Sequence, residues 1–347
     1  MTLQCAAGDE VDRDYWVDYV RGFAALAVAF FHFNEVRPEI GVYSVLTSYG
    51  WLGVPAFFIL SGYCINLAAQ RTDNAGEFFI HRLFRIFPPY YFSLLVVLIV
   101  VAARVLATGT NDITQLPKTF EDVLSTVVLF LSPASNVEGI NWVYWTLVYE
   151  LAFYIVFAIA LIRSQLTFPI VGGITICSII TEFAQLPGLF FLDHWGLFAL
   201  GLGLSHLKQG QRIKASFVIL GAGISIFVNQ KMSEQITALL VAIFAVGVMM
   251  NLLTSKRLIL PTGKFFGDIS YSIYLLHVPI GVYALPMLVR PLRLDREVGL
   301  INAIAVDLSL IAGVSVVAYL SYLFVERPSI KLGRRFGARI HRRLRLA

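Results

Sequence analysis

Long apolar runs are the feature that most restricts how this chain can fold. The hydrocarbon core of a bilayer is about 30 Å thick, and a helix of about 20 apolar residues crosses it. Runs of roughly this length recur along the 347 residues, of which only 14% are charged, against about 25% in soluble domains. They predict an all-α, polytopic membrane bundle of about ten transmembrane helices, near residues 15–36, 47–68, 87–107, 142–163, 168–184, 188–207, 214–230, 235–253, 268–289 and 300–325.

Three segments lie outside this pattern. Residues 119–132 form an apolar run too short to span, which predicts one short re-entrant or interfacial helix packed on the bundle. Residues 1–14 are polar and are expected to form an N-terminal segment, and residues 329–347 a basic tail. The transmembrane domain is therefore expected to cover residues 15–328.

The distribution of positive charge predicts the topology. With ten spans both termini lie on one side, and that side then carries 20 of the 27 Lys and Arg residues. Cytoplasmic loops are enriched in Lys and Arg, so both termini are expected in the cytoplasm. The net charge of +5 follows from this bias and does not indicate a nucleic-acid partner. The three cysteines match no metal-binding spacing, and no metal is expected.

The first apolar run carries Asp18, Arg21 and His32. In a helix, Arg21 and His32 fall within roughly 20° of each other and about 16 Å apart along the axis, and Asp18 lies one turn before Arg21, where an ion pair is possible. Ionisable groups inside a membrane usually face a polar cavity or a partner. The alternative is an arginine that reaches the headgroups and a histidine satisfied by its neighbours.

Two further polar elements follow. Ser61 and Gly62 lie in an apolar helix, where they allow another helix to approach closely. Arg82 and Arg85 share one helical face where the next span begins, and paired guanidinium groups suit a phosphate-bearing ligand. Ordinary positive-inside anchoring explains the same two arginines equally well.

Residues 141–154 and 267–279 each place polar groups inside a span. Glu150 lies about 13 Å along its helix, where it could orient His32, meet a substrate hydroxyl or be structural. Ser270, Tyr274 and His277 form a stripe at i, i+4 and i+7. That stripe is either a polar seam between helices or part of the lining of a ligand path.

Taken together, these segments resemble the acyltransferase 3 family of integral membrane acyltransferases. The resemblance extends from residue 18 to residue 328. It rests on six elements in order: Arg21 with His32 after ten residues, GVPAFFILSGYCI, HRLFRIFPPYY, YWTLVYELAFY, FGDISYSIYLLHVP and FVERP. Thr146 stands where the family commonly has Ser, and the hydrolase-like domain fused to some members is not expected here.

The resemblance implies an O-acyltransferase that moves an acyl group, preferably acetyl, from cytoplasmic acyl-coenzyme A to a hydroxyl of a carbohydrate or lipid-linked glycan. His32 would be the base, which we prefer, or would briefly carry the acyl group itself. Glu150 would orient His32, and Arg21, Arg82 and Arg85 would hold the donor. The supporting residues would be Asp18, Ser61, Asn141, Trp145, Ser270, Tyr274 and His277.

The same resemblance and topology imply an integral protein of the bacterial inner membrane. Its partners would be the lipid bilayer, acetyl-coenzyme A as donor and the glycan acceptor, whose identity stays open, as does assembly into a homo-oligomer. A different class of function also stays open, because a proton-coupled transporter could use Arg21, His32 and Glu150 as a relay.

Overall fold

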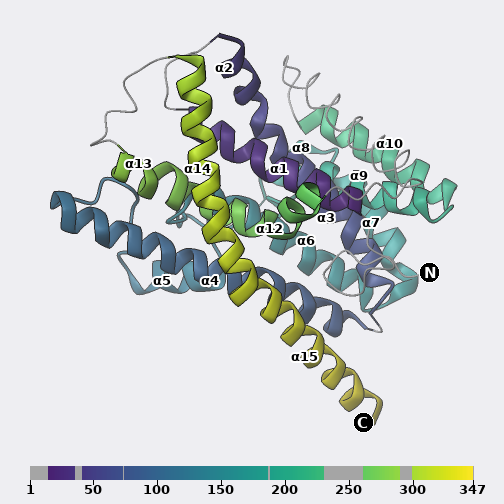
Figure 1. Cartoon of the computed structure of the whole chain (residues 1–347). Helices are drawn as coiled ribbons and strands as arrows, with labels where there is room; N and C mark the ends of the chain where they lie inside the picture. The colour runs from purple at the N-terminus through teal and green to yellow at the C-terminus, as the bar shows by residue number, and fades with distance from the viewer. Residues whose placement is uncertain are drawn as a thin grey trace.

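The computed structural model describes residues 15–35, 41–72, 74–186, 188–229, 261–289 and 299–346. Every regular element in these ranges is helical, which confirms the all-α class (Figure 1). The predicted segment 1–14 and the predicted span 235–253 lie outside the described residues. The α-helices are α1 Tyr15–Asn34, α2 Gly41–Ser48, α3 Gly53–Ala69, α4 Ala75–Thr108, α5 Phe120–Val128, α6 Trp145–Leu161, α7 Thr167–Cys177, α8 Thr181–Ala184, α9 Leu192–Lys208, α10 Arg212–Asn229, α12 Pro261–Leu276, α13 Leu285–Val289, α14 Leu300–Ser321 and α15 Arg327–Leu346.

Short tight turns connect several of these helices, and two π-helical turns interrupt the C-terminal part. One π turn, His277–Ala284, joins α12 to α13, and the other, Tyr322–Glu326, joins α14 to α15. The first contains Pro279, which has no backbone N–H to continue an α-helix. The 3₁₀ turns within the described residues are Tyr49–Leu52, Trp142–Tyr144 and Ser164–Leu166.

Six continuous helical segments of the described chain are long and apolar enough to cross a membrane. They correspond to six of the predicted spans, those near 47–68, 87–107, 142–163, 214–230, 268–289 and 300–325. The segments are Gly41–Ala69, Ala75–Thr108, Trp142–Leu161, Arg212–Asn229, Pro261–Met287 and Leu300–Arg339.

Three other predicted spans are helical but are not among these six. Helix α1 covers the predicted span 15–36, and its polar side chains lower its mean hydropathy. The predicted span 168–184 is two helices, α7 and α8, because the chain turns after Cys177 and Ser178 donates to the Thr175 carbonyl at 2.8 Å. The predicted span 188–207 is shorter, since α9 begins at Leu192. The structure therefore supports six spans, and ten are not confirmed.

The short helix expected near 119–132 is present as α5. A capping box starts it, because Thr119 accepts from the Asp122 amide at 3.1 Å and the Asp122 carboxylate accepts from the Thr119 amide at 3.0 Å. These backbone bonds lower the pKa of Asp122. Its apolar side chains Phe120, Val123 and Leu124 are exposed, and its re-entrant or interfacial placement stays a prediction.

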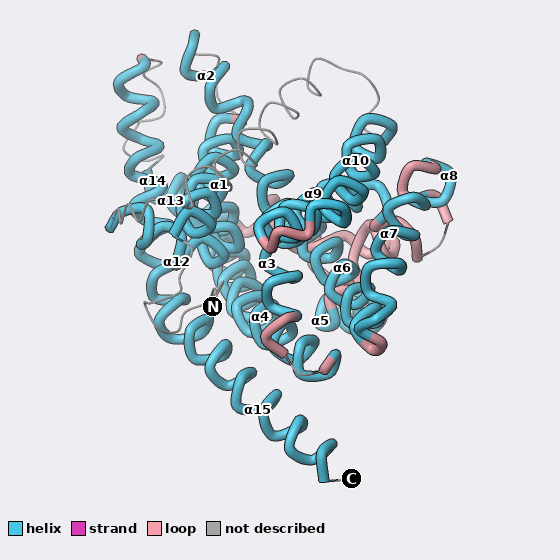
Figure 2. Tube along the Cα trace, turned by 90° about the vertical axis from the view of Figure 1, so that its right-hand side faces the viewer, coloured by secondary structure: helices cyan, strands magenta, loops and turns pink. Residues whose placement is uncertain are grey.

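Helices α1 and α3 lie in the middle of the bundle, with α12 and α14 on one side and α9 and α10 on the other (Figures 1 and 2). Glycines allow the central helices to touch. A side chain at Gly62 would overlap the backbone of Phe198 in α9, and one at Gly22 would overlap Gly267 in α12. Small residues at helix contacts are typical of membrane bundles. They fix the position of α1, which carries Arg21 and His32.

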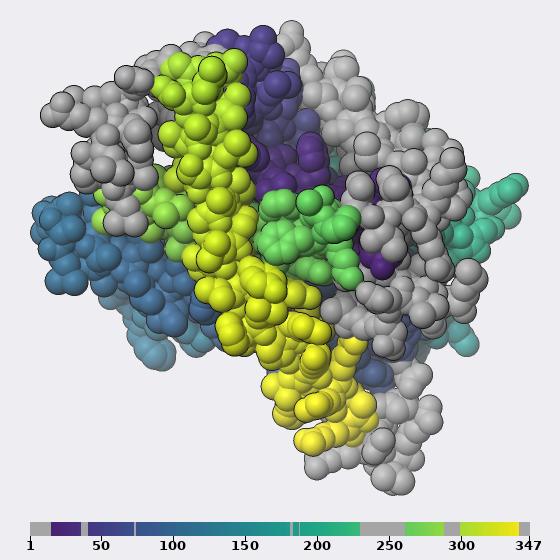
Figure 3. All heavy atoms as spheres, in the orientation of Figure 1, coloured from purple at the N-terminus to yellow at the C-terminus, as the bar shows by residue number. Residues whose placement is uncertain are grey.

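Helix α14, its π turn and α15 form one long rod across a face of the molecule (Figure 3). Helix α15 packs against the N-terminal part of α4 and extends beyond the bundle to the C-terminus. The predicted boundary between the transmembrane domain and the tail, at residues 328 and 329, therefore lies inside a continuous helix.

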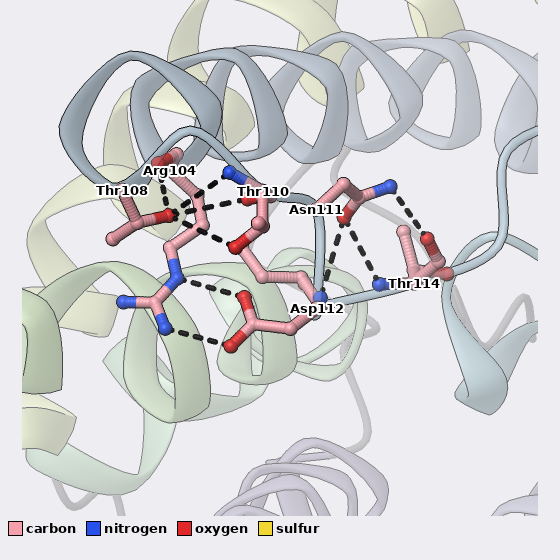
Figure 4. A network of polar contacts seen from close by, with 7 residues as sticks. Arg104, Thr108, Thr110, Asn111, Asp112 and Thr114 are labelled. Atoms are coloured by element: carbon pink, nitrogen blue, oxygen red, sulfur yellow. Dashed lines mark hydrogen bonds and ion pairs between the residues drawn. The ribbon is translucent and has the colours of Figure 1, made fainter.

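At its other end, α4 passes into a loop that a network of polar contacts holds in place (Figure 4). Arg104 donates to both carboxylate oxygens of Asp112, at 2.8 and 2.7 Å. Thr114 donates to the Ile140 carbonyl at 2.8 Å and so ties this loop to the segment that precedes α6. The polar groups of this loop are therefore satisfied by neighbouring residues of the protein.

Candidate functional site

Helix α1 presents its ionisable residues on one side along its axis. The Arg21 guanidinium lies 3.8 Å from the Asp18 carboxylate, so the expected ion pair is present. His32 lies three turns further on, and since α1 is unbroken, about 16 Å of axial rise separates it from Arg21. One helix therefore contributes charged groups to one part of the site and an imidazole to another.

His32 contacts a second histidine, His277, which begins the π turn after α12. Nδ1 of His32 lies 2.9 Å from Nε2 of His277, and the two rings stack with centroids 5.1 Å apart and planes 15° apart. His277 is fully buried, and its Nδ1 lies 3.2 Å from the Ile273 carbonyl oxygen. π turns recur at functional sites, and here the turn carries the partner of His32.

The hydrogen-bond partners determine which nitrogen carries each proton. A carbonyl oxygen only accepts, so Nδ1 of His277 donates to Ile273. Nε2 of a neutral His277 then accepts from Nδ1 of His32. This leaves Nε2 of His32 unprotonated and without a hydrogen-bond partner among the described residues. An imidazole held in that tautomer can take a proton from a substrate hydroxyl.

The cavity around His32, here the His32 cavity, has a volume of about 200 Å³. It is mainly apolar and aromatic, and the Trp142 ring meets the His32 ring edge-on at 6.0 Å between centroids. Besides His32 its lining includes Trp51, Trp142, Trp145, Phe58, His194 and Tyr274.

Glu150 belongs to a neighbouring cavity, here the Glu150 cavity, of about 70 Å³. Its carboxylate accepts from Ser61 at 3.3 Å and from the Tyr154 hydroxyl. The expected orienting contact from Glu150 to His32 is not among its contacts, and His277 holds that position instead. The polar lining brings together Arg21, Ser61, Arg82, Arg85, Glu150 and Tyr274.

Arg82 has an unusual environment for a guanidinium inside a helix bundle. It lies over the rings of Phe78 and Tyr154, at 5.5 and 5.6 Å from their centroids. Its Nε is buried, and it makes no hydrogen bond or ion pair to any described residue. A buried donor without a partner is costly. The Nε donor of Arg82 is thus left unsatisfied by the described part of the protein.

A third cavity, here the Arg334 cavity, opens beyond Arg82 and Arg85 and has a volume of about 340 Å³. Both arginines line it as well as the Glu150 cavity. At its other end, the Glu150 cavity shares Val54, Phe58 and Tyr274 with the His32 cavity. The three cavities form a row, with guanidinium groups at one end and the imidazole at the other.

Several of the remaining predicted residues form hydrogen bonds around the three cavities. Tyr274 lies 2.7 Å from the hydroxyl of Thr146, so threonine at this position still supplies a partner. Asn141 donates to the Leu275 carbonyl at 3.1 Å, and Ser270 donates to the Gly267 carbonyl at 2.9 Å. The stripe on α12 is therefore both a seam between helices and, at Tyr274, a lining of two cavities.

The sequence alone did not single out His194 or Arg334. His194 lines the His32 cavity, with its ring centroid 4.7 Å from that of Tyr149, and its Nδ1 is buried without a hydrogen bond. A single histidine in an apolar run gave no signal. Arg334 was one of many cations in the basic tail. Among the described residues, no group of three side chains is arranged to hold a metal ion.

Comparison with known proteins gives a match over most of the chain. The family described as acyltransferase domain, acyltransferase 3, matches residues 14–323. A putative acetyltransferase of Acidianus two-tailed virus, ORF330, is 29% identical over 75% of this chain and 81% of its own length. The acyltransferase MdmB of Streptomyces mycarofaciens is 24% identical over 91% of this chain and 92% of its own.

A further match covers part of the chain only. A putative O-acetyltransferase of Staphylococcus aureus is 27% identical over 44% of this chain and 25% of its own length. No solved structure matches the chain.

Proposed function

Because the chain belongs to the acyltransferase 3 family and is therefore an acyltransferase, we propose that it moves an acetyl group from acetyl-coenzyme A to a hydroxyl of a glycan. The row of three cavities carries this proposal. Coenzyme A has phosphates at one end and a thioester at the other, linked by a long, thin arm. Guanidinium groups at one end of the row and an imidazole at the other suit a donor of that shape.

In this proposal His32 is the general base. Its Nε2 takes the proton of the acceptor hydroxyl as the hydroxyl oxygen attacks the thioester carbonyl carbon. The carbon–sulfur bond of the resulting tetrahedral intermediate then breaks, and the sulfur leaves with the proton returned by His32. His277 keeps the His32 ring in the required tautomer and accepts part of its positive charge through the 2.9 Å contact.

The remaining polar groups act on the donor. Arg21, Arg82 and Arg85 attract its phosphates and guide it inward, and Glu150 partly balances their charge where the uncharged arm passes. The aromatic rings of the His32 cavity suit the apolar faces of a sugar, and His194 can bond a second hydroxyl.

The basic end of the molecule, with α15, would face the cytoplasm of a bacterial cell, and the membrane would be its inner membrane. The donor then enters from the cytoplasm, and the acceptor reaches His32 from the opposite half of the bilayer. This arrangement accounts for a transferase built from membrane helices.

The decisive measurement is the release of free coenzyme A by purified protein in nanodiscs, with and without a candidate acceptor glycan. We expect thiol release to depend on the acceptor and to stop in His32→Gln. The alternative, a proton-coupled transporter, predicts no release with any acceptor and proton uptake into proteoliposomes that His32→Gln removes. Failure of the folded protein to bind any acyl-coenzyme A would overturn the proposal.

A further inference from the structure

The Arg334 cavity lies where α3 ends, α4 begins and α15 crosses them. Its polar lining contains four guanidinium groups and one histidine against one carboxylate. It has the largest volume of the three cavities in the row. The polar residues are Arg71, Thr72, Glu77, His81, Arg82, Arg85 and Arg334.

Close packing fixes the position of Arg334 in this cavity. A side chain at Gly333 would meet Phe84 of α4, and one at Gly337 would meet His81, so both glycines let α15 touch α4. The Phe84 and Phe336 rings stack with centroids 5.6 Å apart and planes 19° apart. Arg334 therefore belongs to the bundle and not to a loose tail, and α15 is a wall of the cavity.

The arginines divide into two pairs. Arg82 and Arg85 line both the Arg334 cavity and the Glu150 cavity, and so lie where a ligand would pass from one to the other. Arg71 and Arg334 line the Arg334 cavity but not the Glu150 cavity. A ligand extending along the row would meet them last.

We propose that the Arg334 cavity binds the phosphorylated nucleotide of the acyl donor, with Arg71 and Arg334 holding its ribose 3′-phosphate. The order of groups in coenzyme A supports this: the thioester arm is followed by a diphosphate, then by the ribose with its 3′-phosphate. Arg82 and Arg85 take the diphosphate, and the outer pair takes the last phosphate. Guanidinium groups bind phosphate through paired hydrogen bonds, and each charge-assisted bond is strong.

This inference rests on the proposed function, because it assigns a part of the donor to each pair of arginines. It goes further by making the C-terminal helix a component of the donor site. It also predicts selectivity, since a donor that lacks the 3′-phosphate loses the contacts to Arg71 and Arg334 but keeps those to Arg82 and Arg85.

The test measures binding of coenzyme A and of dephospho-coenzyme A, which lacks the 3′-phosphate, by titration calorimetry on the full chain in nanodiscs. We compare wild type with Arg334→Gln and Arg71→Gln. The control is Arg335→Gln, because Arg335 is the next residue on α15 and is exposed. Unchanged thermal midpoints establish that each variant is folded.

We expect the wild type to bind coenzyme A about 10- to 100-fold more tightly than dephospho-coenzyme A. Arg334→Gln and Arg71→Gln should each weaken coenzyme A about 10-fold or more and leave dephospho-coenzyme A unchanged. Arg335→Gln should alter neither affinity.

Two results would overturn the inference while leaving the proposed function in place. One is unchanged binding of both ligands by Arg334→Gln. The other is equal weakening of both ligands, which would mean that Arg334 contributes a general positive field and does not contact the 3′-phosphate. If folded wild type binds neither ligand, the proposed function fails together with the inference, so the two failures are distinguishable.

Discussion

Helix α4 carries arginines near both of its ends, and their surroundings differ. Arg104 donates two hydrogen bonds to Asp112 within a network of neighbouring polar side chains (Figure 4). Arg82 lies over two aromatic rings, with its Nε buried and no hydrogen bond or ion pair to a described residue. The first arginine is paired within the protein and holds a loop.

The histidines divide in the same way. His206, at the end of α9, has its Nδ1 2.9 Å from the side-chain oxygen of Gln211. His32 has one nitrogen bound to His277 and the other without a partner in the described chain. Residue type alone does not identify a functional group in this bundle. The protein itself satisfies the polar atoms of Arg104 and His206, whereas Arg82 and His32 each keep a nitrogen without a partner in the described chain. The following variants test whether this difference marks the functional residues.

The largest expected effect is that of His32→Gln. We expect kcat to fall by about 10²- to 10⁴-fold, because a general base contributes a factor of that order. Donor binding should be unchanged, since His32 lies at the other end of the row from the arginines. His206→Gln is the matched control and should retain full activity in the same coenzyme A release assay. Equal losses of activity in His32→Gln and His206→Gln would show that the two histidines do not differ in function.

The next effect is that of His277→Phe, which keeps a ring in place but removes the acceptor of the His32 proton. We expect kcat to fall about 10- to 100-fold with little change in the KM of either substrate. His277→Gln, whose amide oxygen can accept, should recover part of the loss. A purely structural role predicts no such recovery and a lowered thermal midpoint in both variants.

Arg82→Gln should weaken donor binding about 10- to 100-fold, because it removes charge-assisted hydrogen bonds to phosphate. Calorimetric titration with acetyl-coenzyme A measures this directly, with Arg104→Gln as the control of identical chemistry on the same helix. We expect the control to bind as wild type does. If Arg82→Gln also binds normally, the arginine anchors the helix and is not a donor ligand.

The smallest effect is that of Arg104→Gln itself. The ion pair with Asp112 is at the exposed end of the helix, and exposed ion pairs contribute little. We expect a thermal midpoint lower by at most about 2 °C and full activity. A large loss of activity would show that the loop after α4 has a role in catalysis even though its polar groups are paired with one another.

The sequence predicted what depends on position along one helix. The helical repeat alone places Asp18 beside Arg21 and Arg21 on the same side as His32, and the structure has the ion pair. It could not predict that His32 contacts His277, which is 245 residues away. That contact depends on how closely α1 and α12 approach, and hence on the packing of Gly22 against Gly267.

The sequence failed where polar contacts between helices override the apolar pattern. Residues 168–184 read as one apolar run, yet the chain turns at Ser178, whose hydroxyl is hydrogen-bonded to that of Ser225 of α10 at 2.8 Å. For the basic tail, the sequence likewise predicted only its positive charge and not how it packs. Its packing through Gly333 and Gly337, which brings Arg334 into a cavity, is visible only once α4 is in place.

The shared wall of the His32 and Glu150 cavities has a consequence for the energetics of the cell. In the proposed orientation the two cavities open toward opposite sides of the membrane, and water connecting them would let protons leak across. Val54 and Phe58 supply only hydrocarbon to the wall, and the Tyr274 hydroxyl is paired with Thr146. Apolar constrictions exclude water and ions. In the proposed transferase, the wall that positions the thioester beside the base would therefore also preserve the proton gradient between turnovers.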